Sequence, residues 1–108
     1  MISQIIVDGT KVIEGKLRIL LKDESFVDIW ISVKKKGVYA FHWERRNIDG
    51  KIYRYSNLPD REAKKLKTYP KHYHDGTQEN IIESNLSDNP GEALRIILEF
   101  ARGIILSV

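Results

Sequence analysis

The sequence predicts a single α+β domain over residues 1–108, in which an antiparallel meander of about five strands carries a long carboxy-terminal helix on one face. Short segments of alternating apolar residues follow one another between turn residues from 16 to 84, as in a meander. A helical pattern with capping residues then runs from 89 to 106. A chain of 108 residues has the length of one domain and buries roughly 65% of its unfolded surface, enough for one core.

The first clear strands are predicted at 16–21 and 27–33. In residues 1–14, a short hairpin and a helix followed by a strand both fit the pattern. A loop of residues 23–25 pairs Leu21 with Val27, which places the apolar side chains of both strands on one face. These side chains are Leu17, Ile19 and Leu21 in one strand, and Val27, Ile29, Ile31 and Val33 in the other.

A third strand at 38–46 and a fourth at 51–56 are separated by a turn with an Asp-Gly signal. If the loop between them has an even number of residues, His42 shares a face with Tyr53, Tyr55 and Asn57. A loop with an odd number of residues would separate His42 from that group.

The segment from 57 to 67 is rich in basic residues and is predicted to be an exposed excursion in which Asp60 caps a short helix. Residues 68–76 read as an extended arm with His72 and His74 on one side, and residues 79–84 as the fifth strand. The arm is expected to bring both histidines toward His42 and Tyr55.

The carboxy-terminal helix has the clearest pattern in the chain. Asn89 is the predicted N-cap, Pro90 occupies the first helical position, and Glu92 completes the spacing of a capping box. The apolar stripe of this helix is expected to pack on the sheet face formed by the strands at 16–21 and 27–33. The stripe comprises Ala93, Leu94, Ile97, Leu98, Ala101, Ile104 and Ile105, and is widened by Ile96 and Phe100.

The amino-acid composition excludes several classes of protein function. The chain has no cysteine, which excludes disulfides, thiolate catalysis and four-Cys zinc sites. Its apolar runs are far shorter than the ~20 residues of a membrane span, and its amino terminus lacks a signal-peptide pattern, so we expect a cytoplasmic protein without membrane contact. The net charge of +3 permits an anionic partner such as RNA. Abundant Lys, Glu and Ile with only two Gln is typical of thermophiles.

Four ordered motifs carry a family resemblance. These are Phe41-His42-Trp43, the Arg54–Asn57 strand end followed by Pro59, the Thr68–His74 stretch, and Glu79–Ser84. Together they resemble TumE-like proteins, the toxins of toxin-antitoxin pairs, over roughly residues 16–106. The chain departs from that pattern at Ser56, where the family has an aspartate. It departs also at Asp60, Arg61 and Lys71, where the family has histidines. The resemblance implies a cytoplasmic toxin encoded beside a small antitoxin protein.

Three interpretations of the histidines remain open. In the first, His42, His72 and His74 with Tyr55 and Arg54 form a metal-independent ribonuclease site without a cofactor, because His with Arg or Tyr supplies the acid, base and cation that RNA cleavage requires. In the second, His72 and His74 bind a divalent metal with His42 and either Glu44 or Asp75. In the third, the histidines only satisfy the polar ends of strands and a loop. In the ribonuclease interpretation, the candidates for binding the substrate are Arg46, Asn57, Lys71 and Trp43.

A non-enzymatic function is the alternative from a different class. The sheet face away from the helix is expected to be covered by another molecule. Aromatic residues of the strands could dock a partner protein there or stack on bases. These residues are Phe26, Trp30, Tyr39, Phe41 and Trp43. We therefore expect a homodimer or an antitoxin interface. The basic runs at 34–36 and 61–67 read mainly as solvated surface.

Overall fold

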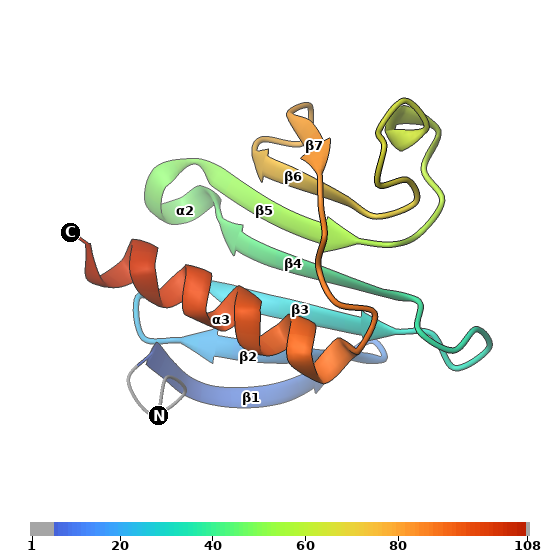
Figure 1. Ribbon diagram of the computed structural model, residues 1–108. Helices are drawn as coiled ribbons and strands as arrows, with labels where there is room; N and C mark the ends of the chain where they lie inside the picture. The colour runs from blue at the N-terminus through green and yellow to red at the C-terminus, as the bar shows by residue number, and fades with distance from the viewer. Residues whose placement is uncertain (1–5, 108) are drawn as a thin grey trace.

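The computed structural model describes residues 6–107 and has two layers, an antiparallel sheet and a helix that crosses one of its faces (Figure 1). The sheet has seven strands in sequential order, each hydrogen-bonded to the next along the chain. They are β1 (Val7–Ile13), β2 (Lys16–Leu21), β3 (Phe26–Ile31), β4 (Tyr39–Arg45), β5 (Lys51–Ser56), β6 (His72–Gly76) and β7 (Ile81–Glu83). The helices are α2 (Arg46–Asp49), the 3-10 turn η1 (Arg61–Ala63) and α3 (Pro90–Leu106).

The prediction of an α+β meander with a carboxy-terminal helix is confirmed, but five strands were too few. The two added strands are β1, where the sequence left two alternatives open, and β6, which was expected to be an unpaired arm. Strand β6 alternates histidine with tyrosine and aspartate rather than apolar with polar residues, so its pattern does not stand out as a strand.

The register of β2 and β3 differs from the prediction by two residues. Ile19 pairs with Val27 and Leu17 with Ile29, and the connection runs over residues 21–25. Within it, the Asp23 carboxylate accepts hydrogen bonds from the backbone N–H and the hydroxyl of Ser25, which holds the turn. Because a shift of two residues leaves each side chain on its own face, the predicted apolar face is retained.

Helix α3 covers that apolar face. Its N-terminus forms as predicted, with the Asn89 side chain accepting a hydrogen bond from the Glu92 N–H at 3.0 Å. Ala93, Ile97 and Ala101 are buried against the sheet. Phe100 meets Tyr53 edge to face, with ring centroids 5.1 Å apart. We call the sheet surface under α3 the inner face and the opposite surface the outer face.

Five aromatic residues were expected to contact a partner protein or bases. Three of them belong to the hydrophobic core instead. Tyr39, Phe41 and Trp43 are each 1% exposed on the inner face. This part of the interaction prediction is therefore wrong, because α3 already covers these rings. The alternation of the strands leaves Phe26 and Trp30 on the outer face, where both are partly exposed.

The hairpin of β4 and β5 decides which residues share a face with His42. Its connection runs over residues 46–50, an odd number, and contains α2. His42 is thereby paired with Arg54 on the outer face. Tyr53 and Tyr55 lie on the inner face, so the structure has the odd-loop alternative, in which His42 is separated from these tyrosines.

Candidate functional site

A line of polar side chains crosses the outer face of the sheet in register. Cross-strand pairing places Arg18 beside Asp28, Asp28 beside His42, His42 beside Arg54, and Arg54 beside His74. We call these five residues the polar row. Neighbouring strands are about 4.8 Å apart, so adjacent members are within side-chain reach. At one end of the row, Arg18 forms a two-point ion pair with Asp28 at 2.7 and 2.9 Å.

His42 is held by a carboxylate from its own strand. Its Nε2 lies 3.1 Å from Oε1 of Glu44, and the His42 side chain is 26% exposed. Hydrogen bonds from Arg46 lower the pKa of Glu44 to about 2, so Glu44 is a carboxylate at neutral pH and can only accept. Burial lowers the pKa of His42 below 6.5 despite the opposing effect of Glu44. A neutral His42 therefore donates Nε2–H to Glu44 and keeps a free lone pair on Nδ1.

Arg54 lies on β5 between the two groups of histidines. Its neighbours across the sheet are His42 on β4 and His74 on β6. Two strand spacings put the backbones of these histidines about 10 Å apart. The single site expected from the sequence is thus an arrangement of two groups, with the Arg54 guanidinium between them. This guanidinium also contacts Gln78, with Nη1 3.4 Å from Oε1.

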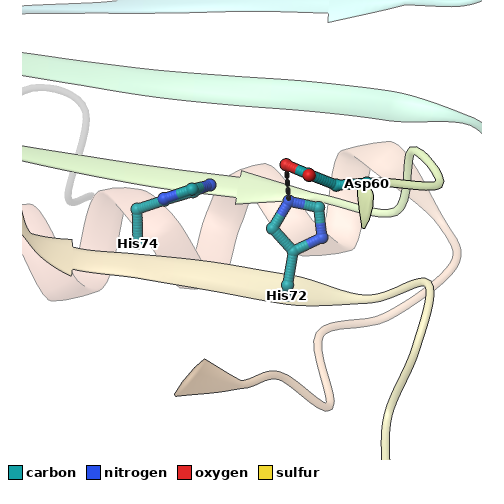
Figure 2. A group of neighbouring side chains, drawn as sticks. All are labelled: Asp60, His72 and His74. Carbon is teal, nitrogen blue, oxygen red and sulfur yellow. Dashed lines mark ion pairs between the residues drawn. The ribbon is translucent and has the colours of Figure 1, made fainter. Parts of the chain in front are cut away.

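The second group consists of His72, His74 and Asp60, which we call the histidine-aspartate cluster. His72 is 3% exposed and His74 is 2% exposed. Nε2 of His72 lies 3.8 Å from Oδ2 of Asp60 (Figure 2). The three residues each offer one ligand atom, and these atoms lie within 4.8 Å of one another.

Asp60 reaches the cluster from the connection between β5 and β6. It caps η1 as predicted, since its Oδ1 accepts a hydrogen bond from the Glu62 N–H at 3.0 Å. Its proximity to the histidines was missed, because the path of a long excursion is not fixed by local pattern. The available signal was a carboxylate four residues after Ser56, the residue that pairs with His72.

The carboxylates that the metal interpretation named lie elsewhere. Glu44 is engaged by His42 and Arg46. Asp75 points to the inner side, where Tyr73 Oη donates a hydrogen bond to Oδ1 at 2.9 Å. The carboxylate that lies beside His72 and His74 is that of Asp60, instead of Glu44 or Asp75.

Tyr55 lies on the inner face, on the side of the sheet away from the polar row. Its ring stacks on Tyr73 with centroids 4.3 Å apart, and burial raises its pKa. It therefore lies outside both histidine groups and stays protonated at neutral pH.

The four predicted substrate-binding residues lie in different parts of the structure. Trp43 is buried and donates Nε1–H to the Ser25 hydroxyl at 2.9 Å. The Asn57 carboxamide joins the ends of two strands by accepting from Tyr39 N–H and donating to the Gly37 carbonyl. Lys71 forms an ion pair with Asp88 at 3.0 Å. Arg46 alone of the four is next to His42, and its side chain is 63% exposed.

Some of the predicted site residues line hollows in the surface. A cavity of about 710 Å³ at the ends of β4 and β5 has Asn57 and Lys71 in its wall. A smaller depression of about 370 Å³ lies along the polar row itself. It is lined by Lys16, Arg18, Phe26, Asp28, His42, Glu44 and Arg54. An extended anionic ligand would meet His42 and Arg54 there.

Comparisons with known proteins give one match. No curated protein and no solved structure is matched. Among the helices that the structure describes, none has the length and apolar character needed to cross a bilayer. A family model described as Toxin TumE matches residues 3–105, nearly the whole chain.

Proposed function

The chain belongs to the TumE toxin family, and we propose that it acts as a ribonuclease toxin that cleaves RNA in the depression along the polar row. Membership of the family implies an antitoxin partner. The observation that supports RNA cleavage is the juxtaposition, in an open depression, of a histidine oriented by a carboxylate with an arginine on the next strand.

The proposed reaction is an internal transfer within the RNA chain. Nδ1 of neutral His42 takes the proton of a ribose 2′-hydroxyl, whose oxygen then attacks the adjacent phosphorus. The bond from phosphorus to the 5′-oxygen breaks, and that oxygen takes a proton from water. The hydroxide ion left behind removes the proton from His42, which restores the neutral base. The products are a 2′,3′-cyclic phosphate and a 5′-hydroxyl end.

Arg54 and Glu44 have supporting parts in this reaction. The Arg54 guanidinium is placed to bind the phosphate and stabilise the charge that accumulates on its oxygens. Glu44 fixes the His42 tautomer, so that Nδ1 rather than Nε2 faces the substrate as a base. Arg46 keeps Glu44 ionised and is exposed enough to contact a neighbouring phosphate.

The test is cleavage of a defined RNA by the purified protein in EDTA, since the reaction is proposed to be metal-independent. His42→Gln removes the base and is expected to reduce the rate by about 100-fold or more. Arg54→Gln should also reduce it strongly, because a charge-stabilising contact is worth about 10²–10³ in rate. The matched control is Arg95→Gln, on the exposed side of α3, which should cleave like the wild type.

Three outcomes would contradict the proposal. Full activity of a folded His42→Gln protein would exclude His42 as the base. Loss of wild-type activity in EDTA would exclude a metal-independent reaction. Absence of cleavage by a protein that still arrests growth and binds its antitoxin would favour the non-enzymatic interaction function.

Oligomeric state is a separate part of the proposal. A homodimer is still the expected form of the free toxin, and it has to leave open the depression that Phe26 lines with His42 and Arg54. Sedimentation of the purified chain, alone and with its antitoxin, decides between a dimer and a monomer.

A further inference from the structure

We propose that the histidine-aspartate cluster binds a divalent transition-metal ion, with Zn²⁺ as the expected occupant. The ligands are Nε2 of His72, Nε2 of His74 and one carboxylate oxygen of Asp60. This goes beyond the proposed function and does not depend on it, because the ion can bind whether or not the protein cleaves RNA.

The first argument is the way both rings are oriented. Nδ1 of His72 lies 2.8 Å from the Pro70 carbonyl oxygen, and Nδ1 of His74 lies 2.8 Å from the Gln78 carbonyl oxygen. A carbonyl oxygen only accepts, so each Nδ1 carries the hydrogen. In the neutral rings the lone pair is then on Nε2 in both histidines. Metal-binding histidines are commonly fixed in this way, by a second hydrogen bond to a carbonyl or carboxylate.

The second argument is burial. Both histidines are at least 97% buried, with exposed fractions of 3% and 2%. The ring centroids are 5.2 Å apart at an interplanar angle of 76°. The ligand atoms of the two rings lie within 4.8 Å of each other, so the two rings can share one ion.

The third argument is the carboxylate. Figure 2 shows Asp60 reaching over from its own segment toward His72, on the side where the rings converge. A simple ion pair between Asp60 and His72 would not involve His74, although its ligand atom lies within 4.8 Å of both other residues. An ion bound to all three residues accounts for both histidine orientations and the carboxylate together.

The distances permit a metal with a small closing movement. Bonds of about 2.0–2.1 Å in a tetrahedral site put ligand atoms about 3.3 Å from one another. The ligand atoms of the cluster lie within 4.8 Å, and the His72–Asp60 pair is already at 3.8 Å. The Asp60 side chain is 38% exposed and can make the remaining adjustment.

The ligand set selects the kind of ion. Two imidazoles and one carboxylate suit Zn²⁺ and its first-row neighbours, whereas Mg²⁺ and Ca²⁺ prefer oxygen ligands. Three protein ligands leave at least one position for water or an anion. Because Arg54 lies beside His74 in the sheet, a phosphate oxygen could take this position while Arg54 contacts the same phosphate.

The binding experiment uses the full chain, freed of metal by chelation and exchanged into metal-free buffer. Calorimetric titration with Zn²⁺ should give one site per chain, and Mg²⁺ should give no heat of binding. Co²⁺ should produce the intense visible absorption of a four-coordinate site. Added Zn²⁺ should also raise the melting temperature in proportion to the logarithm of its concentration above Kd.

Variants distinguish this site from others. Asp60→Asn, at a half-exposed position, and His74→Gln should each weaken Zn²⁺ binding by about 100-fold, since losing even an outer-shell partner costs 10–100-fold. His42→Gln and Asp75→Asn should bind like the wild type, because those residues lie outside the cluster. Asp60→Asn keeps the test valid even if the buried His74→Gln variant fails to fold.

Two results would overturn the proposal. One is the absence of Zn²⁺ binding by chelator-treated protein whose circular dichroism shows it to be folded. The other is Zn²⁺ binding that survives unchanged in Asp60→Asn. Both measurements are made without RNA, so they are independent of the cleavage assay in EDTA.

Discussion

Opposing influences act on the ring of His42. Burial lowers its pKa most strongly, Glu44 raises it, and Arg54 and Arg46 lower it further. From β3, Asp28 faces the same ring but is engaged by Arg18. The net pKa lies below 6.5, so the proposed base is already neutral at pH 7.

The pH dependence of RNA cleavage follows from that direction. The base works only when unprotonated, so kcat/KM should rise with pH and level off, with its acid midpoint below 6.5. Glu44→Gln removes the influence that raises the His42 pKa and should move this midpoint to still lower pH. A pH profile of both proteins between 4.5 and 8 measures the shift. A midpoint above 6.5, or one that rises in Glu44→Gln, would contradict the assignment.

Single residues also show which contacts the sequence could predict and which it could not. The alternation of β4 places His42 on the face opposite Phe41 and Trp43. Asp60 could be recognised as a helix cap but not as a neighbour of His72, since that contact depends on how the excursion folds back over the sheet. The sequence predicts local features such as a helix cap, but it does not predict contacts that depend on the path of a long loop.

At the level of elements, α3 stabilises the sheet through one stripe of its surface. Ile97 is 1% exposed and packs in the core, whereas its sequence neighbour Ile96 is 37% exposed. The same substitution at these two positions therefore isolates the effect of burial from that of helix propensity.

Ile97→Ala should lower the free energy of unfolding by about 2–5 kcal/mol, because it removes buried methyl groups and leaves a cavity. Ile96→Ala should change it by less than about 1 kcal/mol, since its side chain is partly solvated already. Urea unfolding followed by circular dichroism gives both values. Equal losses in the two variants would mean that α3 does not pack as described.

The connections between elements explain why part of the fold could be predicted and part could not. The cap of α3 depends on residues within one turn, and the sequence predicted it correctly. The faces of β4 and β5 depend on whether the connection at 46–50 is odd or even. The sequence left that choice open, because α2 adds residues to what would otherwise be a tight turn.

Considered as a whole molecule, the domain has one covered and one open side. The inner face is sealed by α3, and the polar row occupies the outer face with Lys16 and Arg18 in the wall of its depression. This open strip crosses consecutive strands and carries three cations, Lys16, Arg18 and Arg54, beside the carboxylates of Asp28 and Glu44. We expect a single-stranded anionic chain to bind along it.

Binding of RNA to this strip should depend on salt. Each neutralised phosphate contributes about −0.7 to the slope of log K against log salt for single strands. Lys16→Gln, which removes one cation from the depression, should weaken binding and reduce the magnitude of the slope by about 0.7. Lys51→Gln, whose position alternates with Arg54 to the other side of β5, is the control and should leave it unchanged. Fluorescence anisotropy with a catalytically inactive His42→Gln background measures both.

The strictly sequential sheet has a consequence for synthesis of the protein. The polar row is complete once β6 has paired, at residue 76, but the helix that covers Trp43 and Tyr53 is made only from residue 90 onward. During that interval the nascent chain exposes both the polar row and the aromatic residues that α3 later covers. Chains that stop before α3 would carry this uncovered aromatic surface permanently and should aggregate. The last helix thus determines whether a ribosome releases a folded toxin or an insoluble fragment.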